Sequence, residues 1–343
     1  MKEDYLFGLL TYPTNNLGDE IQSIAARQFL PRVDLYIDRE YDLDKVKSEI
    51  PIKLIMNGWF KHNVSSWPPS PSIRPLFISF HITPLVSDKL MNKHSVSYLR
   101  DNAPIGCRDF FTLQLLKKYG IDSYFSGCLT LTLGYNLKIK NNSITDSKKR
   151  SMIIDLDKNI LKIMPKQLLE KFDFGTHTYL EVGLQQKIIK RLSHSINRSK
   201  YYKKHKNSSW LKEIRYILGG LSEKSYLNKL KIKKRSSNVF NMAENCLYKY
   251  MNAKLVLTSR LHVALPCIAF KTPMIFIKED VHDDRFKGYE DILNIITPVQ
   301  FLRLIKDYKS LEEYAIEKNM LSENKVAALK KDMISRCENF INC

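Results

Sequence analysis

The sequence lacks the features that would place it outside ordinary globular proteins. No apolar run approaches the roughly 20 residues that a transmembrane helix needs. The first five residues, Met1 to Tyr5, are acidic where a signal peptide would be basic, and no small-residue cleavage site follows. We therefore expect a cytoplasmic protein. The chain of 343 residues is 44% hydrophobic and 27% charged, which fits about two globular domains.

Cysteine pairs of the kind that hold metals are also missing. The six cysteines are scattered along the chain, with no Cys-x-x-Cys spacing: Cys107, Cys128, Cys246, Cys267, Cys337 and Cys343. A structural zinc site normally needs closely spaced ligands. We therefore predict reduced, mostly buried thiols and no metal site.

Acidic residues are scarce in one segment. The chain carries 55 lysines and arginines against 36 acids, and residues 185–238 hold sixteen of these cations against two acids. Aromatic side chains interleave with the cations, which would suit nucleic acid. An apolar helical face from Trp210 to Leu221 would instead suit an anionic membrane surface. The segment could also collect anionic substrates, or simply pack its apolar stripe and solvate its lysines. The last interpretation is our default, and nucleic acid is the least favoured.

Strand and helix patterns alternate along most of the chain. The expected strands are 5–11, 52–56, 75–80, 104–107 and one from Tyr124, then 151–156, one within 172–179, 255–258 and 274–277. Helical spacing follows several of them, and such alternation is typical of parallel sheets covered on both faces. We predict an N-terminal Rossmann-like domain over 1–140, a second over 150–305 that includes 185–238, and C-terminal helices over 306–343. A polar, lysine-rich stretch, 136–151, would link the two domains.

Polar side chains follow the expected strands of the first domain. They are Asn16 and Asp19, on either side of Leu17-Gly18, then Asn57 and Trp59, then His81, Arg108, Asp109 and Ser126. Ligands of open parallel sheets bind beyond the carboxyl ends of the strands. The sequence therefore predicts a site on one rim of the sheet.

The sharpest local pattern is an apolar strand that runs into a helix at Thr258-Ser259-Arg260-Leu261-His262. Ser259 would cap the helix. The free N–H groups of a helix start and the Arg260 guanidinium suit phosphate or carboxylate. His262 could move a proton near neutral pH. The alternative is that His262 packs in the core and Arg260 pairs with a surface acid.

Two weaker patterns resemble it. Arg108-Asp109 also joins a strand to a helix, and the alternative there is Asp109 as a helix cap with Arg108 in solvent. Past the strand at 274–277 lie Lys278-Glu279-Asp280 and His282-Asp283-Asp284-Arg285, which together could hold a metal ion. Their spacing is not distinctive, so a polar loop is the default.

Taken in order, these motifs resemble the polysaccharide pyruvyl transferase family. The matching pieces are Asn16-Leu17-Gly18-Asp19-Glu20, Ile105-Gly106-Cys107-Arg108-Asp109 with Thr112 and Leu116, Thr258-Ser259-Arg260-Leu261-His262, and the helix-turn-strand pattern of 264–273. The resemblance spans about 5–293. It implies an α/β fold of two Rossmann-like domains in a GT-B-like arrangement, with the acceptor on the first domain and the donor on the second.

The resemblance also implies an activity. Pyruvate would pass from phosphoenolpyruvate, the co-substrate, to two hydroxyls of one sugar, forming a ketal and releasing phosphate, without a cofactor or a metal. The sugar would belong to a bacterial exopolysaccharide or to its lipid-linked precursor. Such an acceptor favours peripheral contact of 185–238 with the inner face of an anionic membrane.

The resemblance further suggests roles for individual residues. The family's Arg-Leu-His motif maps onto Arg260, Leu261 and His262, with His262 as the acid and Arg260 holding the donor. Ser259, Arg108, Lys278 and Arg285 are further candidates for the donor site. Asn16, Asp19 and His81 would face the acceptor, with Asp19 as the base, and closure of the domains would exclude water.

One departure from the family pattern leaves the substrates open. Gly127 is followed by Cys128-Leu129-Thr130, where many members carry Asp-Pro-Ala. We therefore expect a divergent branch. A GT-B-like glycosyltransferase, with Arg260 holding the diphosphate of a nucleotide sugar, is the alternative function. A non-enzymatic module that binds membrane or nucleic acid is the third.

Overall fold

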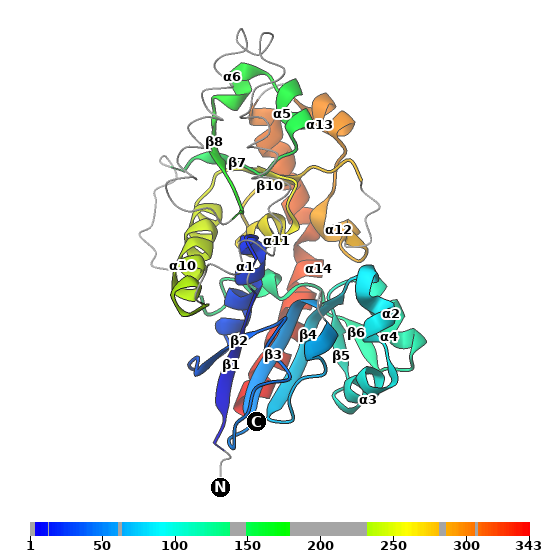
Figure 1. Cartoon of the computed structure of the whole chain (residues 1–343). Coiled ribbons are helices and arrows are strands. Elements are labelled where there is room, and N and C mark those ends of the chain that lie inside the picture. Colours follow the sequence, from blue (N-terminus) through cyan, green and yellow to red (C-terminus); the bar gives the residue numbers. More distant parts are fainter. Residues whose placement is uncertain are drawn as a thin grey trace, which may run out of the picture.

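Two parallel β-sheets form the framework of the protein (Figure 1). The computed structural model describes residues 4–12, 14–60, 64–137, 149–178, 232–280, 286–305 and 308–343. The first sheet has the order β2-β1-β3-β4-β5-β6. Its strands are β1 (Leu6–Thr11), β2 (Leu35–Asp38), β3 (Ile52–Phe60), β4 (Ile73–Ile82), β5 (Ile105–Cys107) and β6 (Ser123–Phe125).

The second sheet has the order β10-β9-β7-β8. Its strands are β7 (Ser151–Ile154), β8 (Phe172–Gly175), β9 (Val256–Thr258) and β10 (Met274–Phe276). In each sheet the first strand in sequence lies between the second and the third, so the chain reverses direction across the sheet at β1/β3 and again at β7/β9. Such switch points are where open α/β sheets bind ligands. The predicted class, α/β with two Rossmann-like units and C-terminal helices, is confirmed.

Alternating side chains of each strand build a core on both faces of each sheet. In the first sheet, Leu9 and Ile78 join the core around α1 (Leu17–Arg27), whereas Leu10 and Phe77 join the opposite core. The opposite core includes α3 (Lys93–Asp101) and α4 (Phe110–Lys118). The remaining short helices are η1 (Val64–Ser66), η2 (Pro84–Val86), α2 (Ser87–Leu90), η3 (Leu129–Thr132), α5 (Lys158–Ile163), α6 (Lys166–Leu169), α12 (Glu290–Leu293) and α13 (Pro298–Leu304).

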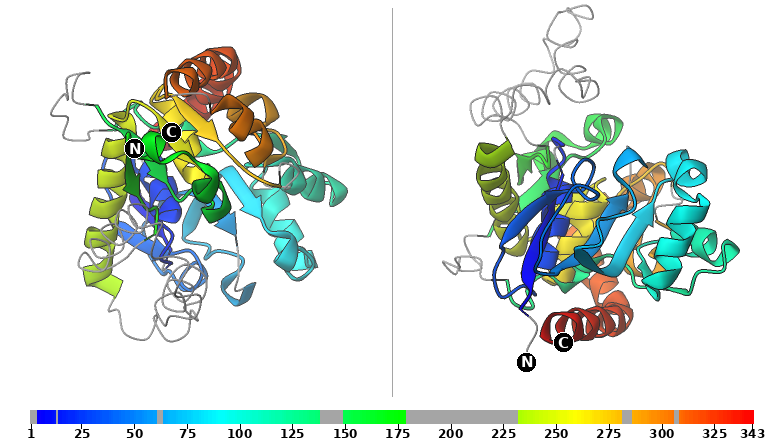
Figure 2. Two further views of the ribbon diagram at one scale, coloured as in Figure 1. Left: turned by 90° about the horizontal axis from the view of Figure 1, so that it is seen from above. Right: turned by 60° about the horizontal axis from the view of Figure 1, so that its bottom comes forward.

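Two long helices tie the units together. Helix α10 (Ile232–Met251) packs along α1, and Arg27 of α1 forms an ion pair with Glu244 of α10. Helix α14 (Tyr308–Asn342) begins beside the second sheet and ends beneath the first (Figures 1 and 2). There the Lys53 ammonium donates a hydrogen bond to the carbonyl of Ile341 at 3.2 Å. One continuous hydrophobic core therefore spans both units.

Several sequence predictions differ from the structure at their boundaries. Strand β2 was not among the predicted strands, and β3 and β4 are longer than predicted. Strand β8 ends at Gly175, within the predicted 172–179. Most of the predicted linker, 138–148, lies outside the described residues. The same is true of 185–231, which is most of the basic stretch 185–238. Within the described ranges, no helix is both long and apolar enough to cross a bilayer.

Candidate functional site

The start of α1 meets the start of α11 (Leu261–Ala269) where the two units touch. Gly18, in the first turn of α1, has no side chain, and a Cβ placed there would lie 2.8 Å from Nδ1 of His262. The backbone N–H of Leu17 donates to the carbonyl of His177, which follows β8, at 2.9 Å. The structure therefore brings the first predicted motif, with Asn16 and Asp19, together with the predicted His262.

Asn16 and Asp19 both have defined partners in this structure. The Asn16 side chain caps α1 by accepting from the Gly18 N–H at 3.1 Å. The buried Asp19 carboxylate accepts from Nη2 of Arg39 at 3.0 Å and from the Thr14 hydroxyl at 2.9 Å. Arg39 also stacks on the ring of Tyr12, 4.3 Å from its centroid. A buried ion pair of this kind fixes the turn after β2 against α1.

Gln22 links the start of α1 to Arg108. Its amide nitrogen donates to the Gly18 carbonyl at 3.1 Å, and its amide oxygen accepts from Nη1 of Arg108 at 3.3 Å. Gly58 has a φ of +98°, and a Cβ there would lie 2.7 Å from Nη1 of Arg39 and 3.0 Å from the Gln22 oxygen. The Arg39 and Arg108 side chains are exposed by only 2% and 1%. The alternative reading of Arg108 as a solvated cation is wrong.

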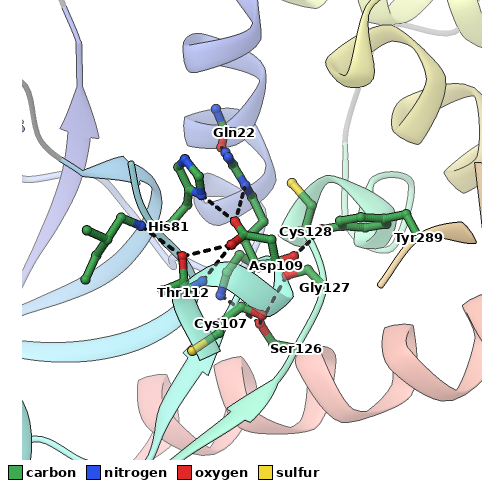
Figure 3. Close-up of polar contacts among 12 residues, drawn as sticks. Gln22, His81, Cys107, Asp109, Thr112, Ser126, Gly127, Cys128 and Tyr289 are labelled. Carbon is green, nitrogen blue, oxygen red and sulfur yellow. Dashed lines mark hydrogen bonds and ion pairs between the residues drawn. The ribbon is translucent and has the colours of Figure 1, made fainter. Parts of the chain in front are cut away.

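Asp109 connects β5 to α4 and has two roles (Figure 3). It caps α4, because one oxygen accepts from the backbone N–H and the hydroxyl of Thr112, both at 2.9 Å. Its other oxygen is hydrogen-bonded to Nδ1 of His81, at the end of β4. Burial opposes ionisation of Asp109, but the contacts with His81, Arg108 and Thr112 together hold its pKa below the usual value.

The second unit contributes Arg260 and His177. Nε of Arg260 donates to Asp155 at 3.3 Å, and the same carboxylate oxygen accepts from the backbone N–H of His177 at 3.0 Å. The Arg260 side chain is about half exposed. The structure corrects the predicted cap of α11, because Arg260 occupies that position and no side chain caps the helix. Ser259 instead accepts from the backbone N–H of Asp157 at 3.3 Å.

The two histidines of the second unit are held uncharged. Burial, with Arg260 nearby, lowers the pKa of His177 to about 3. Burial also takes the pKa of His262 well below its usual value, and the charges of Arg108, His177, Arg39 and His81 add to this effect. His262 therefore lies close to groups from both units. Nδ1 of His177 is 3.0 Å from the Tyr250 hydroxyl, which orients its ring.

Four buried nitrogen atoms around this junction have no hydrogen-bond partner among the described residues. They are Nε of Arg39, Nε of Arg108, Nε2 of His177 and Nε2 of His262. An unpaired buried polar atom costs about 1–3 kcal/mol, so a cluster of four points to a polar ligand that would satisfy them. The described residues contain no group of three or more side chains suited to a metal ion.

The family model for polysaccharide pyruvyl transferases matches residues 16–281. The chain belongs to the polysaccharide pyruvyl transferase family. The matched range includes the junction groups from both units, and the family makes the protein a transferase. A search among curated proteins found no match.

Solved structures of low similarity cover most of the chain. A protein from Klebsiella pneumoniae is 13% identical over 85% of this chain and 93% of its own, with a TM-score of 0.43. A Listeria monocytogenes protein described as a UDP-N-acetylglucosamine 2-epimerase is 9% identical over 98% of both chains, with a TM-score of 0.46. The MnaA protein of S. aureus, solved with UDP, is 11% identical over 99% and 97%, with a TM-score of 0.42.

The other predicted site residues of this transferase follow the next strand of the second sheet or lie outside the described residues. Lys278 follows β10, one strand beyond β9, and its backbone N–H bonds to the Ile296 carbonyl. Arg285 and the other residues of 282–285 in the metal alternative lie outside the described residues. The divergent Cys128-Leu129-Thr130 begins η3, which is fully buried against α1, α11 and α14.

Arg39 and His177 were missed by the sequence reasoning. Each follows a four-residue edge strand, β2 or β8, close to its carboxyl end. The rule that identified His81 and Arg108, a polar residue after a strand, applies to both. Both residues were visible in the sequence as polar residues after a strand. The strands themselves, β2 and β8, are too short to show a clear alternating pattern.

Proposed function

We propose that this transferase moves pyruvate from phosphoenolpyruvate onto two hydroxyls of one sugar, forming a ketal and releasing phosphate. The observation that carries the proposal is the set of four buried nitrogens without a hydrogen-bond partner, drawn from both units, to which Nε2 of His262 belongs. Phosphoenolpyruvate offers carboxylate and phosphate oxygens to such donors. The family match supports pyruvyl transfer as the reaction.

In this proposal the donor binds at the β9–α11 turn. Arg260 is half exposed and held by one 3.3 Å contact with Asp155, so it can turn toward an incoming anion. Arg108 would approach the same anion from the first unit. The N–H groups at the start of α11, which no side chain caps, would add hydrogen bonds near Ser259 and Leu261. Lys278 and Arg285 stay weaker candidates.

His262 would supply the proton that the methylene carbon of the donor must gain. In the free protein this imidazole is neutral, because burial and neighbouring cations lower its pKa. A bound trianion reverses that electrostatic balance and favours the imidazolium form. Donor binding would therefore charge the acid at the moment when it is needed. Closure of the two units around the bound substrates would exclude water.

The acceptor would be a sugar of a surface polysaccharide or of its lipid-linked precursor, facing Asn16, Asp19 and His81 on the first unit. The proposal requires neither a cofactor nor a metal. We place the reaction in the cytoplasm, at the inner face of the membrane if the acceptor is lipid-linked. Contact through 185–238 belongs to the same proposal, and most of that stretch lies outside the described residues.

Phosphate release tests the proposal. Purified protein is incubated with phosphoenolpyruvate and a panel of nitrophenyl hexosides, and phosphate and the mass of the glycoside are followed. We expect release that depends on a glycoside, which gains the mass of a pyruvyl ketal. Arg260→Ala should lower the rate strongly, whereas Arg303→Ala, at an exposed position of α13, should not. Transfer from a nucleotide sugar, without use of phosphoenolpyruvate, would favour the glycosyltransferase instead.

A further inference from the structure

His81 and Asp109 form a buried pair to which the proposed pyruvyl transfer has not yet assigned a catalytic role. They come from the carboxyl ends of the neighbouring strands β4 and β5, which pair at Phe80 and Cys107. This register brings His81 and the residues that follow β5 to the same edge of the sheet, where Nδ1 of His81 is hydrogen-bonded to the Asp109 carboxylate. Both side chains are almost completely buried, at 2% and 0% exposure.

Asp109 fixes the tautomer of His81. Its carboxylate is held in place by Thr112 and kept ionised by its contacts, so it can only accept hydrogen bonds. The neutral imidazole must therefore carry its proton on Nδ1 and its lone pair on Nε2. That is the tautomer that can take a proton from a substrate.

The orientation of the ring suits the same task. Figure 3 shows the second ring nitrogen pointing away from Asp109. The Trp59 ring packs edge-on against the imidazole, with centroids 4.8 Å apart, and restricts its rotation. His81 is also near enough to His262 to influence its charge.

Asp19, the base suggested by the sequence, has a different environment. One of its oxygens is engaged by Arg39 and the other by Thr14. Its contacts tie the turn after β2 to α1, which is a structural role. His81 has the geometry of a proton acceptor, and Asp19 has that of an ion-pair partner.

We infer that His81, positioned by Asp109, is the general base that takes the proton from the attacking sugar hydroxyl. The inference rests on the proposed pyruvyl transfer. In the first addition, His262 gives a proton to the methylene carbon, the hydroxyl oxygen bonds to the central carbon, and the hydroxyl proton passes to Nε2 of His81. In the second, the bond from that carbon to the phosphate oxygen breaks, and the second hydroxyl closes the ketal. The proton of the second hydroxyl restores His262, and the proton held by His81 leaves with the phosphate, which returns His81 to its neutral form.

Three variants test the inference by steady-state phosphate release with the hexoside panel and by calorimetric titration with phosphoenolpyruvate alone. His81→Gln removes the base. Asp109→Asn keeps an oxygen for the α4 cap but offers an amide N–H to Nδ1, which forces the proton onto Nε2. His94→Gln, at an exposed position of α3, is the matched control.

We expect His81→Gln and Asp109→Asn each to lower kcat about 10²–10⁴-fold, with the Kd for phosphoenolpyruvate within about twofold of the parent value. The double variant should be no slower than His81→Gln alone, because Asp109 acts through His81. His94→Gln should behave like the parent. A destabilised fold would weaken donor binding together with turnover.

Two results would overturn the assignment. One is a His81→Gln enzyme that keeps kcat within about threefold of the parent. The other is a parallel loss of turnover and donor binding in both variants, which would make the pair structural. Failure of the proposed function gives a different result. A parent protein that neither binds phosphoenolpyruvate nor releases phosphate from it would contradict the proposed reaction, and the assignment of a base for that reaction would fall with it.

Discussion

At the scale of single residues, the junction is built from groups that are buried in unusual numbers. Arg39, Arg108, His177 and His81 are all at most 2% exposed. Polar side chains of this size are buried when they are paired or when function requires them. Here the pairs with Asp19 and Asp109 account for part of the cluster, and the remaining unpaired atoms define the candidate donor site.

The buried His177 predicts how stability depends on pH. Its pKa is about 3 in the folded protein and near 6.5 in the unfolded chain, so between these values only the unfolded state takes up the proton. Stability is therefore lost as the pH falls below about 6.5, by about 1.4 kcal/mol per pH unit for this histidine. We expect the free energy of unfolding in urea to fall between pH 7 and pH 5, and this fall should be about 2 kcal/mol smaller in His177→Gln than in the parent.

The comparison between variants is essential to that test. Burial raises the pKa of Asp38 to about 6, and this carboxyl acts in the opposite direction between pH 4 and pH 6. The wild-type profile alone therefore mixes both effects. An identical loss in the parent and in His177→Gln would show that His177 titrates normally in the folded protein.

Gly18 predicts a steric link between the units. Gly18→Ala puts a methyl group 2.8 Å from Nδ1 and 3.0 Å from Cβ of His262. One of the two helices must then shift, so we expect a lower melting temperature and a loss of phosphate release of at least tenfold. Gly18→Ala should lower the melting temperature less in a His262→Ala protein than in the parent, because the imidazole ring is no longer there to clash with the new methyl group. An equal penalty in both backgrounds would mean that the two residues are not in contact.

At the scale of secondary-structure elements, α14 is the main test of how the units are joined. Met333 is fully buried beneath the first sheet, where its sulfur receives the Ser79 hydroxyl at 3.7 Å. Met333→Ala should lower the free energy of unfolding by about 2–5 kcal/mol. Met320, on the same helix, is 68% exposed, and Met320→Ala should change it by less than about 0.5 kcal/mol. Equal effects in chemical denaturation would contradict the packing of α14 against the first sheet.

The elements also show what the sequence could predict. Strands β1, β7 and β9 were predicted because each is an apolar run that ends at a polar turn. Strand β2 was not, because four residues of an edge strand carry too little periodicity. The cap at Ser259 was wrong because the Ser259 hydroxyl bonds to Asp157, in a loop distant in sequence.

The site was predictable in part for a related reason. Motifs at the ends of strands gave His81, Arg108 and His262, because position in the chain alone places them on a rim. Their pairing was not predictable, since the bond from His81 to Asp109 depends on the register of β4 and β5. The contact of Gly18 with His262 depends on how two units meet, which no local pattern encodes.

At the scale of the whole molecule, the two units share one hydrophobic core. Contacts cross the junction on several elements: Leu17 to His177, Arg27 to Glu244, and the Tyr289 hydroxyl to the Arg108 carbonyl at 2.6 Å. A donor bound at the junction would therefore need groups from both units. Variants in either unit should weaken the same binding event.

Calorimetric titration with phosphoenolpyruvate at pH 8, where the phosphate is fully ionised, tests this central claim most directly. The account predicts binding that is weakened by Arg108→Ala from the first unit and by Arg260→Ala from the second, with Arg303→Ala unchanged. The heat should vary with the ionisation enthalpy of the buffer in the direction of proton uptake, because the anion favours charged His262. No heat with phosphoenolpyruvate, together with binding of a nucleotide sugar that requires Arg260, would contradict the account.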